Sequence, residues 1–251
     1  MFFFRKPKLI VDAFIPETYQ HTFEYSPVDY ATKFYPDWWK NLPKVKTPYF
    51  GVEHNDVIVT ENTNMKYCEG LTNEYKNSII IPMWTDFFFK YNQDGSWLWK
   101  FADYQSKGES HPLTQRLGFK ENFLHFKLVS PWAFKSDKDV YFQTNMPYYN
   151  YTKELNYENI PGTLEFYYQP TTNINLFIKN KPSEVFIEFN KPILHLKPLS
   201  ERTLVLKKHM MSVKEYYSKF SPAPFTFKKR FLTFKKLKEK KEKKCPFGFG
   251  K

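Results

Sequence analysis

The chain has 251 residues, of which 41% are apolar and 20% aromatic, and it carries a formal net charge of +12. Disordered chains are poor in aromatic groups, so this composition excludes a largely disordered protein and predicts a sizeable packed core. No apolar run approaches the roughly 20 residues that cross a bilayer as a helix. Two cysteines are too few for a disulfide framework, which favours a protein that is intracellular at synthesis.

Residues 1–50 are rich in proline and aromatic residues. Within them, the stretch 34–43 reads as a short helix that prolines bound on both sides, with Asp37 near its start. Trp38 and Trp39 are adjacent, so they project from different sides of a helix, and we expect at least one of them to reach the core. The sequence therefore predicts an N-terminal segment that packs on the main domain.

The clearest local pattern is a hairpin over residues 78–101. An apolar run ends at Tyr91, turn residues follow at 93–96 around Asp94-Gly95, and a second run alternates over 97–101. The alternation places the aromatic side chains of the two runs on one shared face. Pro82 interrupts the first run and predicts an edge, a bulge or a break there.

Short strand-like runs then recur along the chain, separated by proline and glycine turns. The predicted strands are 122–129, 140–144, 163–169, 173–179, 185–189, 193–196 and 203–207. No long helical pattern separates these strands, so crossover units with a parallel sheet are not expected. The predicted fold class is all-β with some short helices, an antiparallel β-sandwich or jelly-roll-like domain over residues 51–210.

Residues 211–251 are predicted to form a helix and a basic tail. Ser212 and Glu215 have the spacing of a capping box. Farther on, nine Lys and one Arg against two Glu give residues 228–244 a net charge of +8, which is most of the charge of the chain. Phenylalanines recur at helical spacing in this stretch, so it has an amphipathic pattern.

The basic tail has three open interpretations. Its cations could bind nucleic-acid phosphates, or it could lie on an anionic membrane surface. Its apolar stripe could instead dock on the domain or on a partner subunit while the lysines stay solvated. The candidate polyanion- or partner-binding residues are Lys228, Lys229, Arg230, Lys235, Lys236, Lys238, Lys240 and Lys241.

Two groups of residues are candidates for a chemical site. His54 and Asp56 have the H-x-D spacing of an Fe(II) facial triad, which His195 could complete in an oxygenase of the double-stranded β-helix type. His111, Gln115 and Arg116 form a polar cluster that could bind an anion or a planar ligand, or could be an ordinary exposed loop. The sequence contains no G-x-S-x-G and no glycine-rich phosphate-binding motif.

Five segments, in order along the chain, resemble an uncharacterised protein family of tailed phages of marine bacteria. The matching segments are 36–43 (PDWWKNLP), 66–71 (KYCEGL), 79–86 (IIIPMWTD), 130–132 (SPW) and 190–201 (NKPILHLKPLSE). The family has no established activity, so the resemblance implies only a phage-associated protein in the host cytoplasm or the virion. In place of the family's Gly before the proline of the last segment, this chain has Lys191.

These observations leave three classes of function. The first is a non-enzymatic binding or structural protein without a cofactor, with a virion or assembly role and other subunits as partners. The second is the Fe(II)-dependent oxygenase. The third is a nucleic-acid-binding accessory protein that acts through the basic tail.

Overall fold

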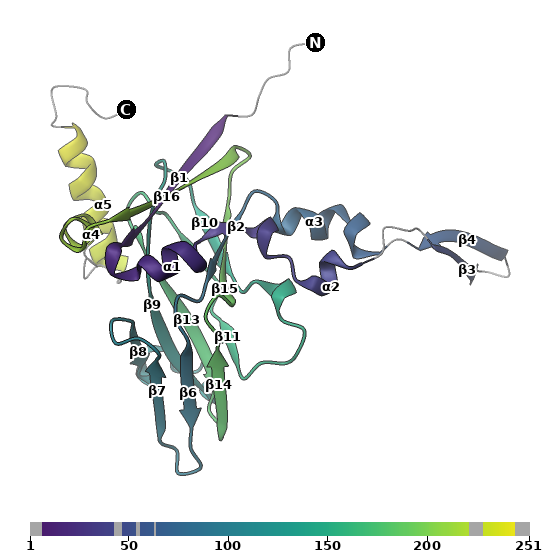
Figure 1. Cartoon of the computed structure of the whole chain (residues 1–251), viewed down its shortest axis with the longest axis horizontal. Coiled ribbons are helices and arrows are strands. Elements are labelled where there is room, and N and C mark those ends of the chain that lie inside the picture. Colours follow the sequence, from purple (N-terminus) through teal and green to yellow (C-terminus); the bar gives the residue numbers. More distant parts are fainter. Residues whose placement is uncertain (1–6, 43–46, 54–55, 63, 221–227, 244–251) are drawn as a thin grey trace.

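The computed structural model describes residues 7–42, 47–53, 56–62, 64–220 and 228–243. Side chains are described within these ranges except at 47–53, 56–62, 228–231, 234 and 241–243. Strands dominate the described part of the chain, which forms a β-sandwich with short helices, so the predicted fold class is confirmed (Figure 1).

The first layer is a six-stranded sheet with the order β11-β13-β9-β1-β16, in which β8 also pairs with β9. Its strands are β1 (Lys8–Pro16), β8 (Lys107–His111), β9 (Phe123–Lys135), β11 (Tyr157–Asn159), β13 (Thr171–Lys179) and β16 (Thr203–Met211). The first and last of these strands, β1 and β16, run parallel, whereas the other pairs of the sheet are antiparallel. The parallel pair joins residues distant in the sequence at the β16 edge of the sheet.

The second layer is a five-stranded sheet with the order β12-β10-β15-β5-β2. Its strands are β2 (Asp29–Tyr30), β5 (Ile79–Pro82), β10 (Phe142–Asn145), β12 (Gly162–Leu164) and β15 (Pro192–Pro198). All four pairings within it are antiparallel. One face of each sheet contributes to a common core, in which β1, β9 and β13 meet β5, β10 and β15.

A three-stranded sheet continues the second layer beyond a break. It contains β6 (Phe87–Tyr91), β7 (Trp97–Phe101) and β14 (Ser183–Ile187) in the order β14-β6-β7. The register pairs Phe89 with Trp99 and Tyr91 with Trp97, as the aromatic alternation predicted. Pro82 ends β5, which confirms the predicted interruption, and the amide of Met83 bonds to the carbonyl of Lys191 across the break at 2.7 Å.

A helical region and a two-stranded hairpin extend from one side of the sandwich (Figure 1). The hairpin consists of β3 (Thr47–Glu53) and β4 (Asp56–Asn62), and it projects away from the sheets beyond α2 and α3. Six short helices precede β5 in the described chain: η1 (Glu17–Tyr19), α1 (Gln20–Tyr25), η2 (Ala31–Phe34), α2 (Asp37–Lys40), η3 (Met65–Tyr67) and α3 (Glu69–Tyr75). Helix α2 is the predicted proline-bounded helix, and its Trp39 is buried, as expected of one of the two tryptophans.

Two C-terminal helices follow β16, and the first of them packs on the outer face of the six-stranded sheet. They are α4 (Val213–Phe220) and α5 (Lys228–Lys243). Two single-turn helices lie earlier, between strands: η4 (Leu113–Gln115) precedes β9 and η5 (Tyr148–Asn150) follows β10. The amide of Glu215 bonds to the hydroxyl of Ser212 at 3.3 Å, which confirms half of the predicted capping box. On the inner side of α4, Tyr216 and Phe220 pack against Ala133 of β9.

The structure corrects one predicted strand and adds detail to the N-terminal segment. The predicted strand at 163–169 is wrong beyond β12, because the amides of Tyr168 and Gln169 bond to the carbonyl of Glu165 and close a turn. Residues 8–16 of the N-terminal segment form β1, a strand between β9 and β16, in addition to the segment's contacts through α2. The domain boundary predicted at residue 50 falls inside β3.

Candidate functional site

The most concentrated polar chemistry of the described chain lies where α3 and β5 meet β15. Glu74 is in the last turn of α3, Ser78 immediately precedes β5, and His195 lies on β15 opposite Ile80 of β5. The connection between α3 and β5 turns at Asn77, whose φ of 55° is tolerated by asparagine better than by most residues. The side-chain oxygen of Asn77 accepts from the amide of Leu204 at 2.6 Å, which holds the turn against β16.

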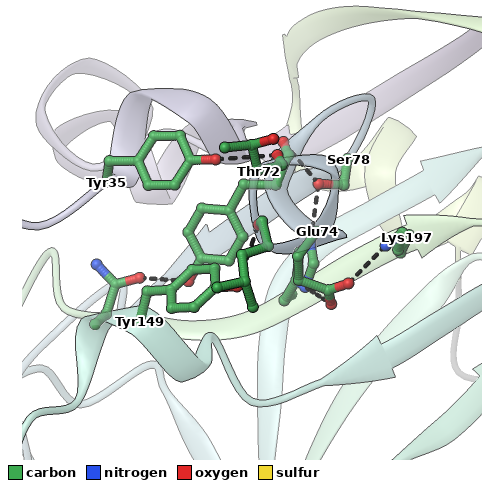
Figure 2. Close-up of polar contacts among 10 residues, drawn as sticks. Tyr35, Thr72, Glu74, Ser78, Tyr149 and Lys197 are labelled. Atoms are coloured by element: carbon green, nitrogen blue, oxygen red, sulfur yellow. Dashed lines mark hydrogen bonds and ion pairs between the residues drawn. The ribbon is translucent and has the colours of Figure 1, made fainter. Parts of the chain in front are cut away.

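Four side chains form what we call the His195 cluster: Glu74, Ser78, His195 and Lys197 (Figure 2). Nε2 of His195 lies 2.8 Å from Oγ of Ser78, and Nδ1 lies 3.6 Å from the Glu74 carboxylate. The other carboxylate oxygen of Glu74 accepts from Nζ of Lys197 at 2.6 Å. The residue types and their order are those of a serine–histidine–carboxylate triad.

The hydrogen bonds have the wrong polarity for such a triad. The Ser78 hydroxyl has one proton, which it donates to the carbonyl of Tyr75 at 3.1 Å. We therefore assign Nε2 of His195 as the donor to Ser78, which leaves Nδ1 without a proton. Since 3.6 Å exceeds hydrogen-bond range, Glu74 does not orient the ring. His195 is thus a hydrogen-bond donor to Ser78 and does not accept its proton.

The cluster is also closed to substrates. Ser78 is 0% exposed and His195 is 1% exposed, whereas Glu74 and Lys197 reach the surface. Burial lowers the pKa of His195 to about 4, against the smaller opposing effect of Glu74, so the imidazole is neutral at physiological pH. A neutral, buried histidine between two strands and a helix cross-links these elements, and no substrate can reach the serine oxygen.

Aromatic side chains pack against the His195 cluster on the side of α2 and α3. Trp39, Tyr75, Tyr149 and Ile80 are buried there, and the ring of Tyr35 stacks on that of Trp39 with a centroid distance of 4.9 Å. The hydroxyls of Tyr35 and Tyr149 donate to the backbone carbonyls of Thr72 at 3.2 Å and Leu71 at 3.1 Å (Figure 2). The hydroxyl of Tyr75 donates to the side-chain oxygen of Asn150 at 2.7 Å. The aromatic cluster therefore joins the helical region to the sandwich without leaving reactive groups free.

The predicted polar cluster at 111–116 is divided by the structure. The ring of His111 stacks on that of His125 with a centroid distance of 4.6 Å, and burial lowers the pKa of His125. The guanidinium of Arg116 donates to the carbonyls of Phe119, Lys120 and Phe123 and lies over the ring of Phe177. Gln115 ends η4 and is exposed. Arg116 thus holds its own loop against the sheet through three carbonyl acceptors, whereas its buried Nε has no hydrogen-bond partner in the described part of the chain.

The predicted metal residues are not brought together where the structure describes them. His54 lies outside the described residues, and Asp56 begins β4 in the projecting hairpin, away from the sheets that contain His195 (Figure 1). Within the described residues, no group of three His, Cys, Asp or Glu side chains is arranged to hold a metal ion.

The basic tail forms the predicted helix, α5, and two of its lysines dock on the domain. Nζ of Lys238 donates to the carbonyl of Tyr167 at 2.6 Å and lies 3.9 Å from the centroid of that ring. Nζ of Lys235 lies 4.8 Å from the ring centroid of Tyr168 and 3.6 Å from the buried carboxylate of Glu165. The interpretation in which all the lysines stay solvated is therefore wrong for these two. Lys236 and Lys240 are exposed. The structure does not describe the side chains of Lys228, Lys229, Arg230 and Lys241.

Sequence reasoning named His195 as a candidate metal ligand and did not relate it to Glu74 or Ser78. Glu74 and Ser78 lie about 120 positions before His195 in the sequence, and nothing in their local pattern relates them to it. Their pairing arises from the sheet register.

Comparison of the chain with protein families, curated proteins and solved structures finds no match. No helix among the described residues is long and apolar enough to cross a membrane.

Proposed function

We propose that the chain is a non-enzymatic binding or structural protein. The observation that carries this proposal is the closure of the His195 cluster. Catalysis by a serine nucleophile requires a hydroxyl that a substrate can reach and a base that accepts its proton. Ser78 is fully buried and donates its proton to Tyr75, so the cluster serves to hold α3 against β5 and β15.

An assembly role, in a phage or its virion, is the more specific part of the proposal. It rests on the resemblance of five sequence segments to a phage protein family. The projecting β3–β4 hairpin is compatible with such a role because strands that pair only with each other offer free edges to a partner chain.

A serine-directed probe tests the absence of catalysis. We expect a fluorophosphonate probe to leave the native protein and the Ser78→Ala variant equally unlabelled. The variant should lose about 1–3 kcal/mol of unfolding free energy, since Nε2 of His195 is left without an acceptor. Ser110→Ala, at an exposed position of β8, is the matched control and should leave stability unchanged. Labelling of the native protein that Ser78→Ala abolishes would overturn the proposal.

A second function, nucleic-acid binding through α5, is favoured by the way this helix docks. Lys235 and Lys238 fix one side of α5 on the turn at Tyr167 and Tyr168. Lys236 and Lys240 lie on another side of the helix, are exposed, and form no ion pair with a described residue. A basic helix held at the surface with outward lysines suits contact with phosphates, which depends on charge and is weakened by salt.

Salt-dependent binding to duplex DNA tests this second function. In the full chain, Lys236→Glu with Lys240→Glu should weaken binding and reduce the slope of log affinity against log salt by about 2. Lys207→Glu with Lys214→Glu changes the net charge equally at exposed lysines elsewhere and is the control. Equal loss in both double variants would mean that the overall charge, not α5, governs the binding.

A further inference from the structure

A pocket with a different character from the His195 cluster opens between β14 and the loop that precedes β11. It has a volume of about 370 Å³, which falls in the range of small-molecule sites, roughly 300–1,000 Å³. Its walls come from residues 150–153, 155 and 157, from Phe186 of β14, and from Glu188 and Lys191 in the connection to β15. We call it the Phe186 pocket.

Two tyrosines line the inner part of the Phe186 pocket. The hydroxyl of Tyr151 donates to the carbonyl of Pro192 at 2.5 Å and accepts from the hydroxyl of Tyr157 at 3.3 Å. Burial raises the pKa of Tyr151, so it stays protonated. The ammonium of Lys191 lies 5.4 Å from the centroid of the Tyr151 ring. Because the Tyr151 hydroxyl is already bonded at both donor and acceptor, this wall offers a ligand mainly ring surface.

Phe186 supplies an exposed aromatic surface at the pocket wall. Strand alternation on β14 sends Val185 and Ile187 into the core and places Phe186 on the opposite face. Its side chain is 58% exposed, although phenylalanine has no polar group to solvate. An exposed ring that lines a cavity is positioned to pack on the apolar face of a ligand.

Polar groups without partners surround this ring. In the described part of the chain, neither the carboxylate of Glu188 nor the ammonium of Lys153 has a hydrogen-bonding or ion-pair partner. Glu184, two residues before Phe186 on the outer face of β14, is different because it pairs with Lys90 at 3.0 Å. The pocket therefore has unused acceptors at Glu188 and unused donors at Lys153, together with an aromatic wall.

We propose that the Phe186 pocket binds a pyranose sugar. An inorganic anion would bind to the lysines but would be repelled by Glu188, and a simple cation would be repelled by the lysines. A purely apolar ligand would leave the charged groups of the rim desolvated and unpaired. A pyranose has an apolar C–H face for Phe186 and hydroxyls that both donate to a carboxylate and accept from an ammonium. A pyranose therefore has complementary groups for the Phe186 ring, for Glu188 and for Lys153.

This inference rests on the proposed binding function, but the two can fail separately. Labelling of Ser78 by a fluorophosphonate would overturn the non-enzymatic proposal and leave the sugar site standing. Absence of sugar binding would remove the site and leave the non-enzymatic proposal intact.

The test uses the full chain and five probes: the methyl glycosides of glucose, mannose, galactose, N-acetylglucosamine and glucuronic acid. Saturation-transfer NMR should show contact of the protein with the ring protons of at least one glycoside. Titration of that glycoside should give an affinity that Phe186→Ala lowers about tenfold or more, since the variant loses both the stacking contact and the apolar area of the ring.

Two matched controls use neighbours of the pocket residues. Phe88→Ala removes the cross-strand partner of Phe186, which does not line the pocket, and should leave the affinity unchanged. Glu188→Gln should weaken binding, whereas Glu184→Gln should not. The proposal is overturned if none of the five glycosides binds, if Phe88→Ala weakens binding as much as Phe186→Ala, or if inorganic phosphate displaces the sugar at equal concentration.

Discussion

The His195 cluster and the Phe186 pocket contain similar side chains in opposite circumstances. Each has a glutamate and a lysine next to aromatic rings. In the His195 cluster, Glu74 is paired with Lys197 at 2.6 Å and the serine and histidine between the strands are fully buried. In the Phe186 pocket, Glu188 and Lys153 have no described partner and Phe186 is exposed.

The difference shows why residue types alone do not identify a functional site. A serine, a histidine and a carboxylate within a few ångströms of each other look catalytic until the direction of each hydrogen bond is assigned. Once each donor is matched to an acceptor, neither the Ser78 hydroxyl proton nor the Nε2 proton of His195 remains available for a substrate. The less conspicuous pocket retains unused hydrogen-bonding capacity, which is what a ligand requires.

The largest loss of unfolding free energy is expected from the buried aromatic residues beside the His195 cluster. Tyr149 is buried between Trp39 and Tyr75, with ring centroid distances of 4.8 and 5.1 Å. Tyr149→Ala should therefore lower the unfolding free energy by about 3–5 kcal/mol, measured by chemical denaturation. The adjacent Tyr148 is 78% exposed, and Tyr148→Ala should change stability by less than about 0.5 kcal/mol. Similar losses of unfolding free energy in the two variants would show that these aromatic residues do not form a packed core.

A smaller effect is expected from acid. The pKa of His195 is depressed to about 4 in the folded state, against about 6.5 in an unfolded chain. The unfolded state therefore binds more protons between these values, so stability is retained above about pH 6.5 and is lost as the pH falls toward 4. We expect a loss of about 2 kcal/mol between pH 7 and pH 5 from this residue.

The control for the acid effect is a pair of glutamine variants. His195→Gln should flatten the dependence of unfolding free energy on pH over this interval. His209→Gln removes a partly exposed histidine that pairs with Asp12 at 2.7 Å. This variant should keep the loss of unfolding free energy that His195 causes between pH 7 and pH 5. An unchanged slope in His195→Gln would mean that this imidazole does not titrate with a low pKa.

Local patterns predicted the local structure well and the His195 cluster poorly. The aromatic alternation around Asp94-Gly95 determined the register of β6 and β7, because cross-strand neighbours in a hairpin are close in sequence. Arg116 was a candidate for ligand binding, with an ordinary exposed loop as the alternative, and its terminal nitrogens donate to backbone carbonyls of the following turn, which composition does not reveal. The 163–169 segment has the aromatic content of a strand, yet the carbonyl of Glu165 closes a turn that receives α5.

The long-range pairs had no signal in a single sequence. The parallel pairing of β1 with β16 joins residues almost 200 positions apart, and short antiparallel connections gave no reason to expect it. The same is true of Glu74 and Ser78 beside His195. Unpaired groups such as Glu188 and Lys153 are harder still, because the absence of a partner is visible only when the whole surroundings are known.

The smallest expected effect compares the two glutamates directly. Glu74→Gln removes a charge that pairs with Lys197 at a partly exposed position, so it should cost about 1 kcal/mol or less of unfolding free energy. The same change also removes the influence that raises the pKa of His195, so acid should destabilise this variant more steeply than the native protein. Glu188→Gln removes a charge without a described partner, and we expect the unfolding free energy to stay within about 0.5 kcal/mol at every pH. If Glu188→Gln is instead as costly as Glu74→Gln, Glu188 holds the fold together, and the Phe186 pocket has no free carboxylate to offer a ligand.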